Sequence, residues 1–501
     1  MNNYDIAIIG AGLGGLFSAV ILSKEGKKVV VVEKGKHPGG SIQGFRRKGV
    51  FFDTGGHYVG GLAPGQNLYK YLNYMGVADK LKVERMDMDG FDHIVFGPQQ
   101  KEFIFAQGYD NFVAKMQRYF PKHKNEIQNY ITQLQEVGNT YPLYSLNYRE
   151  GANHSFKIEH YTTSIAHFFN KITSNKDLQN VLGATNLVYA GRNKTTPYYI
   201  HALVLNSYIQ SSYRFLDGAL QLAERLAEEI ERNGGKVLYN SKVEKLAFKG
   251  KEVEKLICEN GEVIHAKQFI SDVHPSETIK MIPLDKIRKS YRHRLENLEN
   301  TYSVFSIYIV LKPNSFLNIN HNIYYFNQED VWNVDYKQDE WPKSYMLLTQ
   351  TKKAAQKYAD GISIISPMMY EDVKKWETSK HKERPQEYLD FKEIHKERLL
   401  DLVEQQYSGL RSKIEHIEVS TPLTYKHYTA TCEGSLYGIK RDFGDPLKTN
   451  IAPKTKIPNF FFTGQNIDLH GVLGTAVSAV LSCSEILGLD YLLKKIVDYD
   501  N

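Results

Sequence analysis

The stretch Tyr4-Asp-Ile-Ala-Ile-Ile-Gly-Ala-Gly-Leu-Gly-Gly-Leu-Phe-Ser-Ala-Val20 joins a β-type apolar run, a G-x-G-x-x-G pattern and an apolar run with helical spacing. Within the pattern, Gly10 permits a tight turn, Gly12 lets the backbone approach a pyrophosphate, and Gly15 lets a helix pack closely on a strand. A helix that begins here presents unsatisfied N–H groups and its positive dipole end to the phosphates. The stretch therefore predicts the first half of a βαβ unit that binds a dinucleotide.

The second half of this unit follows directly along the chain. Gly26 ends the predicted helix, and Val29-Val-Val-Val-Glu33 has the composition of a buried parallel strand. Glu33 stands at the end of that strand, where an acidic side chain suits the ribose hydroxyls of a cofactor that lacks a 2′-phosphate. The alternative is a purely structural βαβ unit whose glycines bind nothing.

Two further glycine-rich passages indicate which dinucleotide is bound. They are Lys34-Gly-Lys-His-Pro-Gly-Gly-Ser41 and Asp53-Thr-Gly-Gly-His-Tyr58. FAD continues past its pyrophosphate toward the isoalloxazine ring and needs such a passage at this point, whereas NAD does not. No second G-x-G-x-x-G pattern occurs later in the sequence, so a separate pyridine-nucleotide domain is not expected. The predicted cofactor is FAD.

The composition is that of an ordinary globular protein, since 42% of the 501 residues are hydrophobic and 24% are charged. The 63 basic and 57 acidic residues leave a net charge of only +6, which argues against a nucleic-acid partner. The three cysteines, Cys258, Cys432 and Cys483, are far apart and support neither a metal site nor a disulfide framework.

The apolar and basic runs of the chain bear on its place in the cell. A strand is expected from Tyr4 onward, which leaves no room for a cleavable signal. The longest apolar stretch, residues 471–493, is interrupted by Glu485 and Asp490 and does not have the length of a membrane span. We therefore expect a cytoplasmic protein. The basic run at residues 286–294 is a candidate for peripheral contact with an anionic membrane, the alternative being a plain exposed helix.

The chain is predicted to return twice to the nucleotide-binding domain. Residues 217–232 have the spacing of an amphipathic helix, and short strands and a hairpin with a type I′ turn at Asn260-Gly261 follow. Residues 459–480 read as a buried strand, a glycine-rich turn and a small-residue helix, whose N-terminal amides suit the pyrimidine end of a flavin. The expected fold class is α/β, with a discontinuous Rossmann-like FAD-binding domain at residues 1–75, 215–280 and 450–490.

An α+β substrate-binding domain is expected to be interleaved with the first domain, at residues 76–214 and 281–449. Its residues 110–214 are predicted to be mainly helical and are rich in Tyr and Phe, in a chain that is 12% aromatic. Aromatic side chains bury large flat areas and would line a slot for an elongated apolar ligand. The alternative is that these side chains only fill the core.

Together the motifs resemble those of the phytoene desaturase-related flavoproteins, in particular the carotenoid isomerase and retinol saturase branch. The resemblance covers most of the chain and is strongest at residues 4–65, 195–275 and 415–490. It rests on Gly55-Gly-His-Tyr58, on Tyr199-Ile-His-Ala-Leu203, and on Thr421-Pro-Leu-Thr-Tyr425 followed by Gly434-Ser-Leu-Tyr-Gly438. It implies an FAD-dependent oxidoreductase that saturates, desaturates or isomerises the C=C bonds of a lipophilic conjugated polyene, such as a carotenoid or retinoid, by hydride exchange at flavin N5.

The resemblance also implies roles for individual residues. The acid–base candidates are His57, Tyr58, Tyr425 and His470, although each could instead only hydrogen-bond to backbone or flavin. An electron donor or acceptor is required, and its identity and the direction of the reaction stay open. The residues expected to bind FAD are Gly10, Gly12, Leu13, Gly14, Gly15, Glu33, Lys34, Gly40, Ser41, Gly55, Gly56, His57, Val243, Gly464, Gln465, Gly471, Val472 and Leu473.

Two other functions fit the same nucleotide-binding skeleton. Flavin amine oxidases share it, but they often carry a covalent cysteine link near the C-terminal turn, whereas Cys483 lies well past Gly464-Gln465. Rab escort-type proteins also share the fold, and they bind prenyl tails without catalysis.

Overall fold

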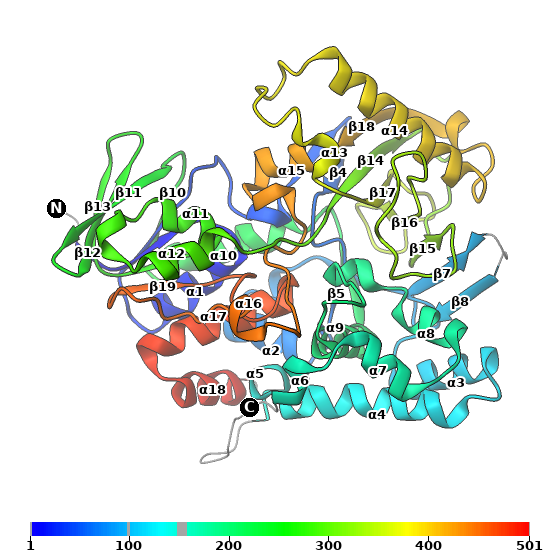
Figure 1. The fold of residues 1–501 in the computed structure, drawn as a ribbon, viewed down its shortest axis with the longest axis horizontal. Coiled ribbons are helices and arrows are strands. Elements are labelled where there is room, and N and C mark those ends of the chain that lie inside the picture. Colours follow the sequence, from blue (N-terminus) through cyan, green and yellow to red (C-terminus); the bar gives the residue numbers. More distant parts are fainter. Residues whose placement is uncertain (1–2, 98–100, 148–157, 500–501) are drawn as a thin grey trace.

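Two large β-sheets and a set of helices form the fold in the computed structural model, which describes residues 3–97, 101–147 and 158–499 (Figure 1). In Figure 1 the sheet that contains the N-terminal strand lies on the left and the second sheet lies on the right. A layer of helices from residues 109–210 runs below the second sheet and toward the centre.

The first sheet has, among the described residues, seven strands in the order β10-β2-β1-β13-β12-β11, and β19 also pairs with β13. β1 pairs in parallel with both β2 and β13, β10 pairs in parallel with β2, and β19 with β13. The predicted return of the chain to the nucleotide-binding sheet is visible in these pairings, while the predicted domain boundaries remain predictions. The strands are β1 (Asn3–Ile9), β2 (Val29–Val32), β10 (Lys236–Leu238), β11 (Val243–Lys249), β12 (Glu252–Cys258), β13 (Val263–Ser271) and β19 (Phe460–Phe462).

Both faces of the parallel strands are buried, which explains why β2 consists of valine alone. On one face Val29 packs in the same cluster as Phe17 of α1 (Leu13–Lys24), and on the other face Val30 packs in the same cluster as Ile279. α1 packs against α10 (Leu220–Arg232) and α17 (Gly471–Leu487). The sheet therefore lies between two helical layers, as a dinucleotide-binding sheet does.

The hairpin between β12 and β13 is present, but its predicted turn type is wrong. Gly261 has φ +84°, whereas Asn260 does not have the positive φ that a type I′ turn requires at both central residues. Gly261 N–H donates to Cys258 O at 3.0 Å, and Cys258 N–H donates to Glu262 O at 2.9 Å. The loop therefore has three residues, 259–261, instead of two, and it ends on a single left-handed glycine.

The second sheet has, within the described ranges, seven strands in the order β18-β14-β17-β16-β15-β7-β8, all antiparallel except the parallel pair β15 and β7. β14 is buried along its whole length between β17 and β18. Helix α14 (Gln386–Glu404) contributes Phe391 and Leu399 to the cluster on one face. The strands are β7 (Asp92–Phe96), β8 (Lys101–Phe105), β14 (Ser303–Leu311), β15 (Asn322–Phe326), β16 (Ser344–Gln350), β17 (Gly361–Met368) and β18 (Ile414–Ser420).

Residues 109–210 are mainly helical in the structure, as predicted, with residues 148–157 outside the described ranges. Most of α9 is buried, and its His201 lies between the hydroxyls of Tyr130 and Tyr189, at 2.8 and 2.9 Å. The helices of this block are α3 (Tyr109–Tyr119), α4 (Lys124–Thr140), α5 (Pro142–Ser145), α6 (Ile158–Thr162), α7 (Ile165–Ile172), α8 (Lys176–Gly183) and α9 (Tyr198–Gln210).

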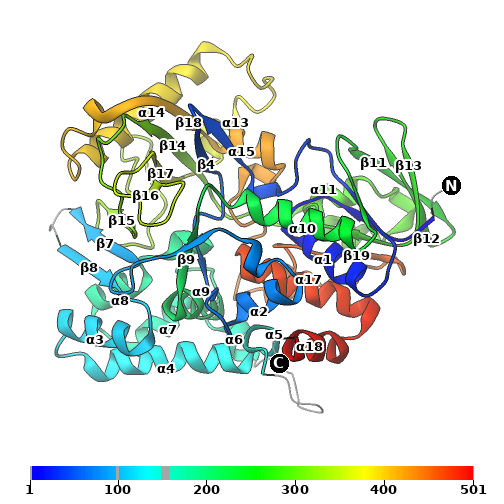
Figure 2. The same cartoon turned by 180° about the vertical axis from the view of Figure 1, so that it is seen from behind.

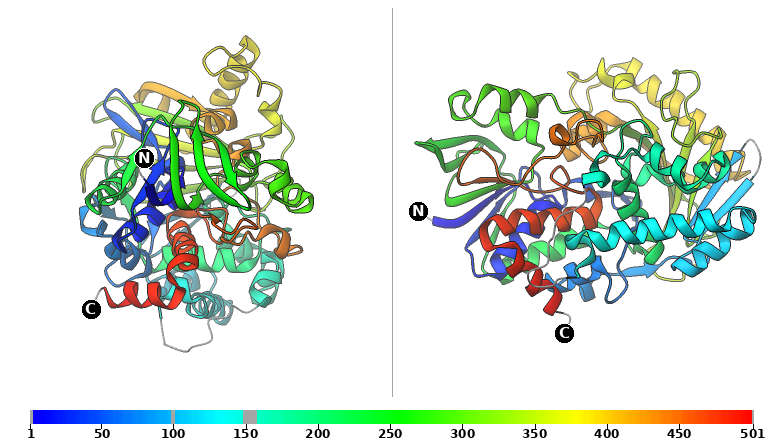
Figure 3. Two further views of the ribbon diagram at one scale, coloured as in Figure 1. Left: turned by 90° about the vertical axis from the view of Figure 1, so that its left-hand side faces the viewer. Right: turned by 60° about the horizontal axis from the view of Figure 1, so that its bottom comes forward.

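Short strands join the two halves of the molecule at its centre, where β4 and β9 are visible in Figure 2. The C-terminal helices, red in Figure 3, return to the N-terminal elements: α17 packs on α1, and α18 packs on α2. These elements are α2 (Asn67–Tyr74), α18 (Leu489–Asp498), the pair β3 (Gly44–Arg47) and β4 (Val50–Asp53), and the sheet of β5 (Val59–Gly60), β9 (Ser212–Phe215) and β6 (Val83–Arg85).

The basic run at residues 286–294 falls in α12 (Lys289–Glu296) and the segment before it. Two of its cations serve the fold: Arg292 donates to Ile279 O, and Arg294 donates to Lys448 O and Asn450 O. Across the described residues, no helix combines the length and the apolar character needed to cross a membrane.

Candidate functional site

A cavity of about 780 Å³ lies at the carboxyl ends of the parallel strands β1, β2 and β13. Ile9, Val32 and Asp272 line it at or just after the ends of these three strands. In open α/β sheets the crevice outside the carboxyl ends of the strands is where ligands bind. The cavity extends from there to α9 and to α15 (Pro422–Thr429).

The glycine turn at residues 10–15 packs so closely against its neighbours that side chains would not fit there. Gly10 has φ +96°, which favours glycine, and a Cβ on Gly15 would lie 2.1 Å from Gly10 O. Gly15 is therefore the residue at which helix and strand meet, and it does not line the cavity. Gly12 and Gly14 do line it, and α1 begins at the next residue after Gly12 with its free N–H groups directed toward the turn.

Glu33 fixes the turn to the end of β2. Its two carboxylate oxygens accept from Ala11 N–H and Gly35 N–H, each at 2.7 Å, and the side chain is buried. An ionised carboxylate has about four lone-pair sites, so two sites remain for ribose hydroxyls. Lys34 follows on the same wall, and burial lowers the pKa of its ammonium group.

The predicted FAD-binding residues come together on this wall. Two of them, Gly15 and Gly464, do not line the cavity. Gly464 packs against Asp272 instead, since a Cβ on Gly464 would lie 2.0 Å from a carboxylate oxygen of Asp272. The others line the cavity: Gly10, Gly12, Leu13, Gly14, Glu33, Lys34, Gly40, Ser41, Gly55, Gly56, His57, Val243, Gln465, Gly471, Val472 and Leu473.

His57 and His470 line the cavity with a buried ring nitrogen each. Neither Nδ1 has a hydrogen-bond partner among the residues that the structure describes. Burial lowers the pKa of His57 to about 4 and that of His470 to about 3, so both rings are neutral near pH 7. A neutral imidazole can accept or donate a hydrogen bond at Nδ1, depending on its tautomer.

The hydroxyls of Tyr58 and Tyr425 are already engaged away from the cavity. Tyr58 Oη donates to Asp92 Oδ2 at 2.9 Å and lies 2.7 Å from Tyr324 Oη. Tyr425 Oη lies 2.7 Å from Ser306 Oγ and 2.8 Å from a tyrosine hydroxyl on the same strand, β14. The rings of both tyrosines line the cavity, but these hydroxyls bond to residues that do not. The acid–base role predicted for the two tyrosines stays a prediction.

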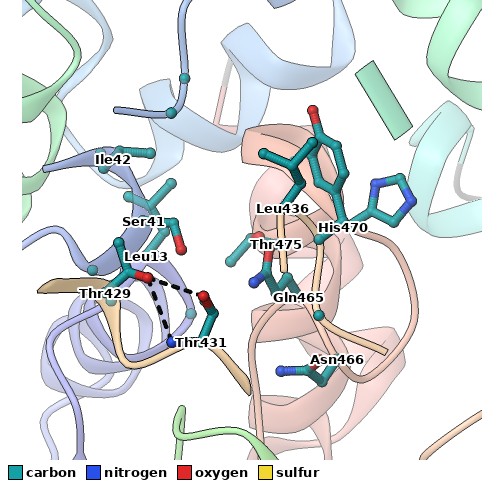
Figure 4. Close-up of a pocket in the computed structure, with 18 of the residues that line it drawn as sticks. Leu13, Ser41, Ile42, Thr429, Thr431, Leu436, Gln465, Asn466, His470 and Thr475 are labelled. Carbon is teal, nitrogen blue, oxygen red and sulfur yellow. Dashed lines mark hydrogen bonds between the residues drawn. The ribbon is translucent and has the colours of Figure 1, made fainter. Parts of the chain in front are cut away.

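Sequence reasoning missed several residues of the wall. Asp272 follows β13 directly, and a polar residue just after a predicted strand was the signal that could have found it. Thr429 and Thr431 carried no such signal, because the last residue of α15 and the turn after it bring them there; their Oγ1 atoms lie 3.0 Å apart. Figure 4 shows Leu13, Ser41 and Ile42 on one side of the pocket and Leu436, His470 and Thr475 on the other.

The wall contributed by the helical block and the second sheet is apolar. Leu203 and Val204 of α9 line it together with Met346 of β16 and Ile365 of β17. Tyr208 lies beside Tyr58 there, with ring centroids 4.5 Å apart. Among the described residues that line the cavity, the charged side chains lie elsewhere: Glu33, Lys34, Lys242, Glu244, Asp272, Glu277, Lys280 and Lys426.

Comparison with protein families agrees with this geometry. A sequence model of the family described as flavin containing amine oxidoreductase matches residues 13–487. The chain belongs to this family. The fold of this flavin oxidoreductase is the expected α/β class, and its cofactor is FAD, which the glycine cradle, Glu33 and the two free imidazole nitrogens fit.

Relatives of this flavin oxidoreductase include an all-trans-retinol 13,14-reductase from Danio rerio, 28% identical over 96% of this chain and 86% of the relative. Prolycopene isomerase 1 from an Oncidium hybrid cultivar is 23% identical over 98% of this chain and 85% of its own length. A solved structure of putrescine oxidase bound to putrescine superimposes with a TM-score of 0.64 over 97% of this chain and 99% of that one, at 14% identity. This last likeness concerns the fold alone.

Proposed function

We propose that the protein saturates, desaturates or isomerises C=C bonds of a lipophilic conjugated polyene of the retinoid or carotenoid type. The retinol reductase and prolycopene isomerase relatives, which are matched over nearly the whole chain, support this substrate class. Both named activities concern the double bonds of an isoprenoid polyene, so the shared feature is the substrate class rather than one reaction.

The observation that carries the proposal is the apolar wall opposite the glycine turn. Leu203, Met346 and Ile365 come from three different elements and present hydrocarbon to the cavity. A polyene chain has no groups that need a polar partner, whereas an amine substrate carries a cation that must be paired when it is buried. Within the described residues, no carboxylate stands on this part of the wall.

FAD, when bound, supplies hydride transfer and carries the difficult chemistry. The glycine turn and Glu33 would hold its dinucleotide part, and the N-terminus of α17 would face the part of the ring system where negative charge develops. His57 and His470 hold or release a proton at Nδ1 on the same wall. The buried Tyr58 and the half-buried Tyr208 exclude water and give the polyene a flat surface.

The experiment uses purified holoprotein in its oxidised and its reduced form, incubated with a panel of retinoids, carotenoids and simple amines. Product mass and retention are measured for each. A gain or loss of two hydrogens indicates saturation or desaturation, and an unchanged mass with a shifted isomer indicates isomerisation. Turnover of amines with release of hydrogen peroxide, without any change in the polyenes, would identify an amine oxidase instead.

We also propose that the protein works in the cytoplasm at a membrane surface, from which a polyene can enter. Leu284 and Leu447 are 76% and 87% exposed. Two arginines of α12 donate to the residues next to them: Arg292 to Pro283 O, and Arg294 to Lys448 O. Exposed leucines beside basic side chains favour an anionic bilayer. Sedimentation with anionic vesicles tests this: binding should weaken in a double Leu284→Ser, Leu447→Ser variant, and a protein that never sediments would contradict it.

The electron partner is proposed to reach the flavin as a separate molecule.

A further inference from the structure

Asp272 is a carboxylate placed inside the glycine turn. It follows β13 directly and lines the cavity. Its oxygens lie 2.3 Å from the positions that a Cβ would take on Gly12 and on Gly14, and 2.0 Å from that position on Gly464. The three glycines therefore leave the space that the carboxyl group of Asp272 fills.

This position is the one at which a dinucleotide presents its pyrophosphate. The N-terminus of α1 attracts a phosphate group through its free N–H groups and dipole. A carboxylate in the same place adds a second negative charge, and two anions that share a site disfavour each other's ionised form. A protonated carboxyl group has the opposite effect, because its O–H can donate a hydrogen bond to a phosphate oxygen.

The surroundings of Asp272 already favour the protonated form. Burial raises the pKa of its carboxyl to about 7; Gly15 N–H opposes the rise by donating a hydrogen bond, and the negative charge of Glu33 adds to it. A bound pyrophosphate brings further negative charge and acts in the same direction.

We propose that Asp272 is a positioning residue for the FAD pyrophosphate, which it binds as a neutral acid through an O–H hydrogen bond, so that FAD binding takes up one proton when Asp272 is ionised beforehand. The balance is simple: one proton from solvent joins the carboxylate, and no other bond forms or breaks. The inference rests on the FAD cofactor of the proposed function and goes beyond it by naming the protonation state in which the cradle binds.

Other ionisable groups face the same part of the cavity, and their effect on the pH dependence of FAD binding must be distinguished from that of Asp272. His274 is neutral near pH 7, since burial lowers its pKa to about 4, and Lys280 is paired with Glu277 at 2.6 Å. Burial lowers the pKa of Lys34, so loss of its charge at high pH would also weaken the binding of an anion. The groups that remain on this wall are Glu33, Lys242, Glu244, Lys426 and Cys432.

The test is a titration of the full-length apoprotein with FAD, followed by flavin fluorescence, from about pH 6 to about pH 9. For the wild type, the dissociation constant should rise by about tenfold per pH unit above about pH 7. The Asp272→Asn variant keeps the shape and a donor group without the charge, and it should bind FAD at high pH as tightly as the wild type does at low pH. A matched control is Asp92→Asn: burial also raises the pKa of Asp92 to about 7, but this residue does not line the cavity, so the wild-type slope should persist.

An Asp272→Asn variant that keeps the wild-type slope would overturn the inference and point to Lys34. Weaker binding of the variant at every pH would also overturn it, because the ionised carboxylate would then be the form that helps. If the variant does not fold, calorimetry of a Lys34→Arg variant, whose guanidinium stays charged, at about pH 8 in buffers of different ionisation enthalpy decides: about one proton taken up per FAD supports the inference, and none overturns it. A wild type that binds no FAD at any pH would instead refute the cofactor itself.

Discussion

At the scale of single residues, Glu33 has the most consequence for cofactor retention. Glu33 is the predicted ribose-binding acid, and it also holds the glycine turn through Ala11 N–H and the segment after β2 through Gly35 N–H. Replacing it by alanine leaves both donors without their acceptor, at a cost of about 1–3 kcal/mol for the buried Ala11 N–H and less for the partly exposed Gly35 N–H. We expect Glu33→Ala to be purified with little or no flavin, as measured by visible absorbance, whereas the exposed Glu254→Gln should stay fully yellow. A Glu33→Ala protein with full flavin content would contradict this role.

Asp92 makes a prediction about pH and stability. Burial raises the pKa of Asp92 from 3.8 to about 7, so the folded state holds a proton that the unfolded state has lost, and stability falls as the pH rises through this window. Asp92→Asn removes this dependence. Between about pH 5 and about pH 8, the free energy of unfolding of the wild type should fall relative to that of the variant by about 2 kcal/mol. Urea unfolding of the holoproteins measures the difference, and parallel curves would show that Asp92 does not titrate in this range.

At the scale of elements, the close packing of α1 on the end of β1 requires that residue 15 has no side chain. A Cβ on Gly15 would lie 2.1 Å from Gly10 O, so Gly15→Ala must push the helix away from the strand. We expect a protein without bound FAD and with a lower melting temperature. Gly26→Ala is the matched control, since nothing lies within 4 Å of its Cβ position and alanine at its φ of +76° costs only about 1–2 kcal/mol. Normal flavin content in Gly15→Ala would mean that the junction is not needed for the cradle.

The hydroxyl of Tyr425 joins helix α15 to β14. Removing this hydroxyl tests whether Tyr425 has a structural or a catalytic role. Tyr425→Phe loses the bonds to Ser306 and Tyr308 and should lower the free energy of unfolding by about 1 kcal/mol. Polyene turnover should stay within about twofold of the wild type. Removal of a true acid–base group costs about a hundredfold or more, so a loss of that size at unchanged stability would restore Tyr425 as a catalytic residue.

At the scale of the whole molecule, local sequence patterns predict the structure of the nucleotide-binding part better than that of the expected substrate-binding part. The βαβ unit and its acid follow from contiguous residues, because a tight turn, a helix N-terminus and a buried strand each require particular residue types. The directions of the Tyr58 and Tyr425 hydroxyls depend instead on Asp92, Tyr324 and β14, which reach these positions only through the second sheet. Asp272 likewise meets the glycine turn through the long-range pairing of β13 with β1.

The most direct test of a flavin and a polyene sharing this cavity is a titration of the oxidised holoprotein with retinol or prolycopene, followed through the visible absorption band of the flavin. A polyene that lies along the apolar wall beside the cofactor should perturb this band in a saturable way, with one polyene bound per flavin. Simple amines should leave the band unchanged. A band that responds to amines and ignores every polyene would contradict the assignment of this wall to an isoprenoid substrate.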